Sequence, residues 1–261
     1  MKTVVVSNQK GGVGKSTLTV LLAHWLVDKR RERVAVIDLD HQANASKVLA
    51  QFDGGVPAGM LLRPAEVGAG PDDGAQLVLF AATKPLVDVE RHRPDVVFPA
   101  FRMQVEALTR RFDRVLIDTP PSLGIRMGAA LYAAEGVVCP IELEEFSLDG
   151  VTDMLKTVYG MRQKHNPSLR LAGLIANRFN PHSLRQKHAL ADLINGYAEF
   201  VVPARISTRS AIPEALAAGV PVWRLSKTSA REAAAEVCRA FELLWERVES
   251  KGDAVAPLQE A

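Results

Sequence analysis

The glycine-rich segment from Lys10 to Thr17 (KGGVGKST) constrains this chain more than any other, because of what flanks it. The β-branched run 4–6 before it predicts a short buried strand, and apolar residues at helical spacing after it predict a helix over 15–30. A glycine-rich turn between a strand and a helix lets backbone N–H groups and the helix dipole converge on an anion. The segment therefore predicts a phosphate-binding loop, called the phosphate loop below.

Each residue type in the phosphate loop suits one part of a nucleoside triphosphate with its magnesium ion. Glycines let the backbone curl so that N–H groups point at phosphate oxygens. The Lys15 side chain would hold the β- and γ-phosphates, while the Ser16 hydroxyl would ligate Mg²⁺. A flexible glycine turn without a ligand would leave the Lys-Ser-Thr triplet unexplained. The expected nucleotide contacts are Gly11, Gly12, Val13, Gly14, Lys15, Ser16 and Thr17.

The composition is that of an ordinary globular chain. Its 261 residues are 48% hydrophobic and carry a formal charge of only +2, which excludes intrinsic disorder. The longest apolar stretch, 18–27, is interrupted by His24 and is too short to span a bilayer. An apolar run follows the first three residues, so no secretory signal is expected. The two cysteines, Cys139 and Cys238, indicate a reducing, cytoplasmic compartment rather than a disulfide framework.

Alternating buried runs and helical patterns predict the fold class. They indicate an α/β protein with a mostly parallel, doubly wound sheet and helices on both faces. Strands are expected at 4–6, 33–38, 114–118, 136–141 and 171–176. Helices are expected at 15–30, 101–112, 123–134, 147–164 and 183–195, and in a C-terminal segment with Val237, Phe241, Leu244, Trp245 and Val248 on one face.

The chain is expected to form one domain over residues 1–261, because no stretch has the composition of a linker between two cores. Residues 53–75 hold six Gly and three Pro, which predicts a surface loop insertion with a short helix around Met60. Residues 252–261 are expected to form a frayed tail.

Position 9 departs from the ordinary nucleotide-binding pattern G-x-x-x-x-G-K-[ST], because it is Gln9 and not glycine. Position 10 is lysine, so the segment resembles the deviant Walker A motif, K-G-G-x-G-K-[ST], of the ParA/MinD family of ATPases. The resemblance covers nearly the whole chain and implies a P-loop ATPase that uses ATP and Mg²⁺. In that family the first lysine reaches across a dimer interface to the partner's nucleotide, which implies a catalytic role for Lys10. A solvated loop lysine is the alternative.

Two carboxylates follow the second expected strand, in the run 38–42 (DLDHQ). The run resembles the D-x-D-P-Q switch I of the family, with His41 in place of the proline. Asp38 and Asp40 lie at the carboxyl end of a strand, where open α/β sheets bind ligands. The resemblance implies that Asp40 orients the attacking water and that Asp38 lies nearer the Mg²⁺ shell. Acidic residues at strand ends also serve as helix caps, which is the alternative.

An apolar strand that ends in Asp118 predicts a Walker B motif. Its carboxylate would bind Mg²⁺ through water. Residues 119–124 would then form switch II and sense the γ-phosphate. Ser122 is expected to cap the helix that starts near Leu123.

Two weaker matches concern the adenine base. Asn177 and Arg178 end a later strand and resemble the adenine-contacting position of the family. The segment 203–206, with Pro203 and Arg205, resembles the segment whose backbone lines the base. Asn and Pro at strand ends are also ordinary turn residues.

The C-terminal part of the chain resembles short plasmid-type partition ATPases, in the runs 212–215 (IPEA) and 219–223 (GVPVW). Proteins of this type lack an N-terminal helix-turn-helix domain, and no room for one is expected before Lys10. The resemblance implies a homodimer with ATP that binds DNA non-specifically, and a ParB-like centromere-binding partner that stimulates hydrolysis. It also implies a cytoplasmic, nucleoid-associated protein with a low basal ATPase rate.

Charge is spread unevenly along the chain. Residues 155–231 carry twelve Lys and Arg against three Asp and Glu, a net of +9. Such a span suits the DNA phosphate backbone without base readout, and a solvated helical face is the alternative. Residues 232–261 are acidic, so no membrane partner is expected. The expected DNA contacts are Arg205, Arg209, Arg224, Lys227 and Arg231, with Arg185 and Lys187 as second choices.

Two other functions share this set of motifs. Relatives that position chemosensory arrays, microcompartments or flagella would have the same ATPase site and a different cargo. A metabolic ATP-dependent ligase, such as a dethiobiotin-synthetase-like enzyme, would bind no DNA and would hold a small molecule at its dimer interface. The switch motifs and Lys10 favour the partition ATPase.

Overall fold

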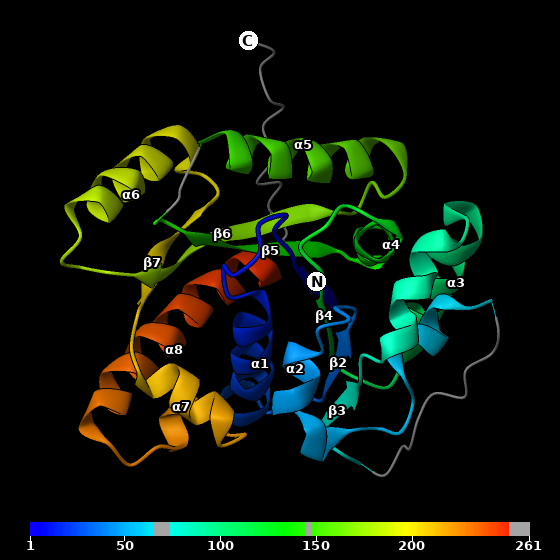
Figure 1. Cartoon of the computed structure of the whole chain (residues 1–261), viewed down its shortest axis with the longest axis horizontal. Helices are drawn as coiled ribbons and strands as arrows, with labels where there is room; N and C mark the ends of the chain where they lie inside the picture. Colours follow the sequence, from blue (N-terminus) through cyan, green and yellow to red (C-terminus); the bar gives the residue numbers. More distant parts are fainter. Residues whose placement is uncertain (65–73, 145–147, 251–261) are drawn as a thin grey trace.

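Parallel strands form the central layer of the computed structural model, which describes residues 1–64, 74–144 and 148–250 (Figure 1). Within these residues one sheet has the strand order β3-β2-β4-β1-β5-β6-β7, and every neighbouring pair is parallel. The strands are β1 (Thr3–Val6), β2 (Val34–Asp38), β3 (Leu77–Phe80), β4 (Arg114–Asp118), β5 (Gly136–Glu142), β6 (Arg170–Phe179) and β7 (Val201–Ser207). The predicted parallel sheet is confirmed.

Helices cover both faces of the sheet, as a doubly wound fold requires. The α-helices are α1 (Lys15–Trp25), α2 (Asn44–Val48), α3 (Pro94–Leu108), α4 (Ile125–Ala133), α5 (Leu148–Lys164), α6 (Leu184–Tyr197), α7 (Ala211–Ala217) and α8 (Thr228–Glu249). A π-helical turn, Leu26–Arg30, extends α1, and a 3₁₀ helix, Lys84–Arg91, precedes α3. In Figure 1, α4, α5 and α6 lie on one side of the sheet, and α1, α7 and α8 lie on the other.

Two apolar cores lie on the two faces, because alternate strand residues point to opposite sides. In β1, Val5 belongs to the core that α3, α4 and α5 cover, whereas Val4 and Val6 belong to the core that α1 and α8 cover. The apolar residues predicted on one face of the C-terminal helix are all buried: Val237, Phe241, Leu244, Trp245 and Val248. Among the described helices, none combines the length and the apolar character that crossing a bilayer requires.

Two strands were not expected from the sequence. β3 has only four residues and follows a glycine-rich stretch, so no periodic pattern marks it; its place comes from pairing with β2. β7 forms an edge of the sheet and pairs with β6 through an irregular register. Pro203 is exposed in β7, as expected for a residue without an N–H donor in an edge strand.

Two helix starts differ from the prediction. α3 starts at Pro94 rather than at residue 101, because proline fits the first helical position, where no N–H donor is needed. α4 starts at Ile125, and its N-cap residue is Gly124, which has no side chain. The expected cap from Ser122 is therefore wrong. The carboxylate of Glu90 caps the helix instead, because it accepts from the backbone N–H of Ile125.

The expected loop insertion is only partly described. Within it the short helix predicted around Met60 exists, as a 3₁₀ helix over Ala58–Leu62. Its residues Ala58, Leu61 and Leu62 are buried in the core that α3 covers. Part of the insertion (65–73) and the expected frayed tail lie outside the described residues.

His24 makes the stability of this fold depend on pH. The side chain is buried in α1, and its Nε2 has no hydrogen-bond partner among the described residues. Burial lowers the pKa of His24 from 6.5 to about 4. The neutral form is therefore favoured in the folded state, and its stabilising contribution is complete above pH 6.5 and is lost as the pH falls towards 4. That loss amounts to ~3 kcal/mol.

We expect the free energy of unfolding, measured with urea at pH 7 and pH 4.5, to fall less in His24→Leu than in the unsubstituted protein. The difference should be ~2–3 kcal/mol, because only the buried imidazole must gain a proton against its surroundings. His188→Leu is the control, since His188 is exposed on α6. Equal pH dependence in the two variants would contradict the assignment.

Candidate nucleotide-binding site

The phosphate loop joins β1 to α1, at the carboxyl edge of the sheet. Gly12 and Gly14 have φ of 79° and 90°, a conformation that residues with a side chain rarely adopt. A Cβ at Gly14 would also overlap the amide nitrogen of Asn177. The backbone conformation therefore favours glycine at both positions. At Gly14 the close approach of the Asn177 side chain, from β6, is a second reason.

Lys15 lies at the centre of the site, with a buried side chain. Its Nζ donates to the carbonyl oxygen of Lys10 over 2.9 Å. Burial lowers the pKa of Lys15, while the negative charges of Asp118 and Asp40 act against that shift. The ammonium group thus faces the phosphate loop and two carboxylates, where it would meet the phosphates of a nucleotide.

Asp118 is fully buried at the end of β4, in register with Val6 of β1 and Asp38 of β2. Its Oδ1 accepts from the Thr19 hydroxyl over 3.3 Å, and the Ser16 side chain also bonds to the carboxylate. Its Oδ2 has no hydrogen-bond partner among the described residues. Burial is the main reason why the pKa of Asp118 is raised to about 8, and the negative charge of Asp38 adds to this shift.

These properties fit the predicted magnesium ion. Mg²⁺ prefers oxygen ligands and commonly binds a carboxylate either directly or through water. Asp118 offers a buried carboxylate oxygen that has no partner in the described part of the chain, and Ser16 offers a hydroxyl beside it. A divalent cation would also offset the cost of burying a negative charge there.

Asp38 has a different environment from Asp118, although both are buried. Its Oδ1 accepts from the backbone N–H of Asp40 over 3.0 Å. Its Oδ2 accepts from the N–H and the hydroxyl of Ser46, over 2.8 and 2.7 Å. Burial raises the pKa of Asp38, and these hydrogen bonds act against the shift. In this structure the carboxylate holds the segment 40–46 in place, and its expected position near Mg²⁺ stays a prediction.

Asp40 faces the cleft beside the phosphate loop. Its Oδ1 accepts from the N–H of Gln42 over 3.0 Å, and the Nδ1 of the exposed His41 lies 3.6 Å from the same oxygen. The cleft has a volume of about 660 Å³. Predicted site residues that line it are Gly11, Gly12, Gly14, Lys15, Ser16, Thr17 and Asp40. The structure therefore brings most of the predicted phosphate-site residues to one cleft.

Asn177 and Arg178, at the end of β6, also reach the phosphate loop. The Asn177 side chain donates to the carbonyl oxygen of Val13 over 2.8 Å. Arg178 donates to the carbonyl oxygen of Gly12 over 2.9 Å and pairs with Glu142 over 3.2 Å. Arg178 has φ of 54°, an uncommon backbone conformation that is often found at functional sites. Their contact with adenine stays a prediction.

Pro203 and Arg205 are not brought to this cleft. Both line a separate groove of about 710 Å³ between α6, β7 and α8. The Arg205 guanidinium lies over the Phe179 ring, 4.8 Å from its centroid. Both residues lie within β7, which extends to Ser207, and their contact with the adenine base stays a prediction.

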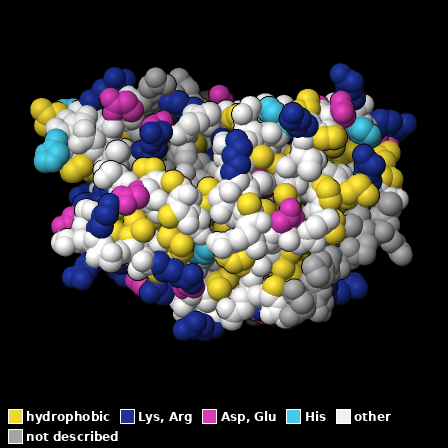
Figure 2. Space-filling model, turned by 60° about the horizontal axis from the view of Figure 1, so that its bottom comes forward, with side chains coloured by type: hydrophobic (Ala, Val, Ile, Leu, Met, Phe, Trp, Pro, Cys, Tyr) yellow, Lys and Arg dark blue, Asp and Glu magenta, His cyan; other side chains and the backbone are white. Residues whose placement is uncertain are grey.

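Most of the predicted DNA-binding cations are paired with acids of the same chain. Arg209 pairs with Glu232 and Glu236, Arg224 with Asp28, and Lys227 with Glu214, at 2.6–2.7 Å. Arg231 is exposed at the start of α8, and Arg185 and Lys187 are exposed on α6. On the face shown in Figure 2, Lys and Arg side chains are dispersed among acidic and apolar ones. Their DNA contacts stay a prediction.

Sequence reasoning missed three side chains that shape the site: Asn8, Ser46 and Arg126. Asn8 directly follows β1; its Nδ2 donates to the carbonyl oxygen of Pro140 over 2.8 Å, and its Oδ1 accepts from the N–H of Lys10. A polar residue at the end of a buried strand would have indicated Asn8. Arg126 is a lone charge in an otherwise apolar helix, which is also a recognisable signal. Nothing local in the sequence marks Ser46.

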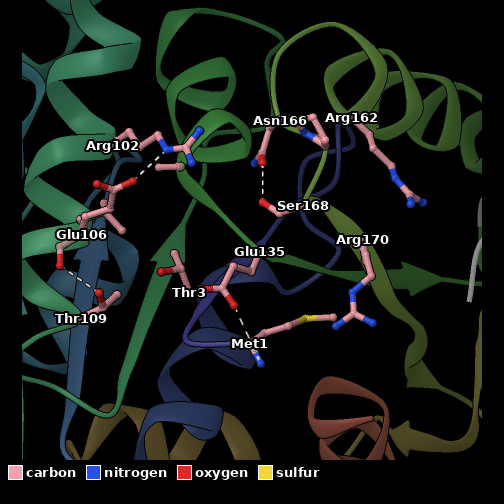
Figure 3. A pocket seen from close by; sticks show the side chains of 13 residues that line it. Met1, Thr3, Arg102, Glu106, Thr109, Glu135, Arg162, Asn166, Ser168 and Arg170 are labelled. Atoms are coloured by element: carbon pink, nitrogen blue, oxygen red, sulfur yellow. Dashed lines mark hydrogen bonds and ion pairs between the residues drawn. The ribbon is translucent and has the colours of Figure 1, made fainter. Parts of the chain in front are cut away.

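A second cavity, of about 530 Å³, lies at the opposite, amino edge of the sheet and contains none of the predicted residues (Figure 3). Arg102 pairs with Glu106 over 2.9 Å, and the Met1 ammonium lies 3.9 Å from Glu135. Arg162 lies in the last turn of α5, where the helix dipole favours a cation, and Nη1 of Arg170 donates to the carbonyl oxygen of Ser250 over 3.3 Å. The charge of the cavity is thus explained by the fold.

A glycine-rich phosphate loop at the carboxyl edge of a parallel sheet, opposite a buried strand-end aspartate, defines a P-loop nucleotide-binding domain. Residues 4–222 match the model of the CobQ/CobB/MinD/ParA nucleotide binding domain family. The chain belongs to this family, and it is a ParA-like member, as the sequence motifs predict.

Three known proteins illustrate the likeness. Protein IncC of Escherichia coli is 39% identical over 95% of this chain and 70% of its own length. The chromosome-partitioning ATPase Soj of Thermus thermophilus is 33% identical over 88% of this chain and 90% of its own. A variant of Cyanothece McdA, solved as an ATP complex, has a TM-score of 0.80 and 19% identity over 97% of this chain and 98% of its own. This last match shows the shared fold.

We expect Gly14→Ala to weaken ATP binding by roughly tenfold or more, because a left-handed conformation costs a residue with a side chain about 1–2 kcal/mol and the new Cβ displaces Asn177. Titration with a fluorescent ATP analogue measures the change. Gly160→Ala is the control, since Gly160 lies in α5 with open space around it. It should keep full affinity and gain up to about 1 kcal/mol of stability. Unchanged affinity in Gly14→Ala would exclude the phosphate loop as the binding site.

Proposed function

We propose that this protein is a partition ATPase, which hydrolyses ATP with Mg²⁺ at a low basal rate and couples that cycle to DNA segregation. The observation that supports this most is the single cleft formed by the phosphate loop and Asp40, with Asp118 buried beneath it. The likeness to Soj, a chromosome-partitioning ATPase, supports the same function. The IPEA and GVPVW runs, which resemble plasmid-type members, favour a plasmid as the cargo.

In the proposed mechanism the chain positions the phosphates and stabilises their charge, because phosphoryl transfer needs little covalent chemistry. Backbone N–H groups of the phosphate loop and the Lys15 ammonium would bind the β- and γ-phosphates. Ser16 and Asp118 would hold Mg²⁺, which supplies positive charge to the phosphate oxygens. Asp40, at the rim of the same cleft, would orient the attacking water. Asp38 keeps Asp40 in position through the backbone hydrogen bond described above.

Lys15 must change partner when a nucleotide binds. Its ammonium donates to the carbonyl oxygen of Lys10, the residue proposed to reach the nucleotide of a second subunit. Phosphate oxygens would replace that carbonyl as the acceptor for Lys15. Release of the Lys10 backbone would then leave this residue able to extend towards the partner, so that ATP favours a homodimer.

The remaining steps concern the partners. The ATP-bound dimer would bind DNA non-specifically through basic residues of the span 155–231, in the cytoplasm and on the nucleoid. A ParB-like centromere-binding protein would stimulate hydrolysis, after which the dimer separates and releases DNA. A different cargo would leave the ATPase site unchanged, and a metabolic ligase would show no nucleotide-dependent DNA binding.

DNA retention tests this function directly. The full chain is passed over immobilised DNA of mixed sequence with ATP and Mg²⁺, with ADP, and without nucleotide, and sedimentation is measured in parallel. We expect retention and dimerisation with ATP alone. Lys10→Ala should keep ATP binding but stay monomeric, whereas Lys84→Ala, on the exposed 3₁₀ helix before α3, should behave as the unsubstituted protein. Equal retention in all three states, or none, would refute the proposal.

The ion pair between Lys227 and Glu214 yields a prediction about the DNA surface. Its two side chains are 60% and 45% exposed and lie 2.6 Å apart. We expect Lys227→Ala to weaken DNA binding by the ATP-bound protein and to reduce the slope of log affinity against log salt by about 1. Glu214→Gln should strengthen binding, because it removes the charge that competes with phosphate. Binding titrations from 50 to 200 mM salt check both variants, and no change in either would remove Lys227 from the interface.

A further inference from the structure

Arg126 has a buried, charged side chain that takes no part in the ATPase cycle proposed above. It lies in the first turn of α4, and only 4% of its surface is exposed. Its Nε donates to the Glu90 carboxylate over 2.7 Å, and its Nη1 donates to the carbonyl oxygen of Leu39 over 3.0 Å. One guanidinium thus joins three segments that are far apart in the sequence.

Glu90 contributes a second set of bonds to the same junction. Its Oε2 accepts from the backbone N–H of Ile125 over 2.6 Å, and its Oε1 lies 3.4 Å from the N–H of Arg126. Glu90 therefore caps the N-terminus of α4 from a distant segment. A Cβ at Gly124 would overlap this carboxylate, so a larger residue there would displace the Glu90 side chain. Burial acts to raise the pKa of Glu90, but the bonds from Arg126 and Ile125 outweigh it and hold the pKa below its usual value.

Leu39 connects this junction to the candidate site. It stands between the two carboxylates of switch I, and its N–H donates to the carbonyl oxygen of Asp118 over 2.9 Å. Its carbonyl oxygen accepts from Arg126. Both backbone polar groups of Leu39 are thus bonded to the segment that begins with Asp118 and continues into α4.

The chemistry of this junction requires arginine. A planar guanidinium donates in two directions at once, to the Leu39 carbonyl and to a carboxylate, whereas a lysine ammonium has no such rigid fork. Burying that charge is costly unless it is paired and hydrogen-bonded, and Glu90 meets this need. Removing either partner would leave the other charge buried alone.

We infer that Arg126, together with Glu90, is a positioning residue that makes two segments respond to nucleotide as one unit. One is the segment 38–46, which contains switch I (residues 38–42), and the other runs from Asp118 to the first turn of α4. This inference rests on the proposed ATPase function. The side chain lines no part of the nucleotide cleft, so its effect passes through the Leu39 backbone to Asp40. Breaking the junction would loosen both segments and uncouple them from each other.

The test compares Arg126→Met and Arg126→Lys with Arg102→Met in the full chain. Arg102 forms an exposed ion pair on α3 and is the matched control. Hydrogen exchange is followed without nucleotide at the amides of 40–46 and 125–128. Removal of Arg126 should speed exchange in both segments by roughly tenfold, because a hydrogen bond to a charged group is lost. The control should change neither segment.

Steady-state ATPase assays provide a second readout. We expect kcat to fall by roughly tenfold or more in both Arg126 variants, while the ATP dissociation constant stays within about threefold, because water orientation depends on placement more than binding does. Faster exchange confined to 125–128, with 40–46 unchanged, would overturn the inference. If the unsubstituted protein hydrolyses no ATP, the proposed function fails, whereas the exchange comparison still decides the coupling.

A variant that does not fold is replaced by Glu90→Gln. Its amide oxygen can still accept from the N–H of Ile125, so α4 keeps a cap while the charge pair is lost. Urea unfolding identifies the folded variants. Faster exchange at 40–46 in Glu90→Gln supports the coupling, and unchanged exchange there overturns it.

Discussion

The parallel register of β1, β2 and β4 is the constraint on which the rest of the site depends. Val6, Asp38 and Asp118 stand side by side where these strands end. Because β1 leads directly into the phosphate loop, the same register places the loop beside both carboxylates. Buried apolar faces on each side of the sheet fix this register, since a shift by one residue would turn Val4–Val6 to the wrong cores. The chemistry of the cleft is therefore a consequence of core packing.

Burial at this edge gives the two strand-end carboxylates different roles. Asp38 is satisfied by three donors of the chain, which fixes the segment that carries Asp40. Asp118 keeps an oxygen to which no residue of the described ranges bonds, and its raised pKa reflects the cost of a charge held in that position. The negative charges of Asp118 and Asp40 both act on Lys15. A divalent cation would add positive charge beside these carboxylates when nucleotide binds.

Much of the fold and the phosphate site could be predicted, because their signals are local. A strand, a glycine-rich turn and a helix within thirty residues identified the phosphate loop, and aspartates at strand ends identified the carboxylates. The bonds of Ser46 to Asp38 and of Glu90 to Arg126 could not be predicted, since each depends on how distant segments pack. The same limit applies to β3, which only its pairing with β2 defines. The groove that Pro203 and Arg205 line could not be predicted either, since it is formed by α6, β7 and α8, which are separate in the sequence.

Charge along the sequence is also a poor guide to charge at the surface. The span 155–231 has a net charge of +9, yet acids outside it meet its cations in the folded chain. Glu232 and Glu236, from α8, hold Arg209, and Asp28, from the end of α1, holds Arg224. These pairs lie at 2.6–2.7 Å and are partly exposed, so each stabilises the fold only slightly and can be exchanged for a phosphate at low cost. In the proposed DNA complex, DNA phosphates would displace these carboxylates one by one. A dimer would double the number of such exchanges and so gain affinity that a single subunit lacks. The ATP dependence of the proposed DNA binding would follow from this charge balance through dimerisation.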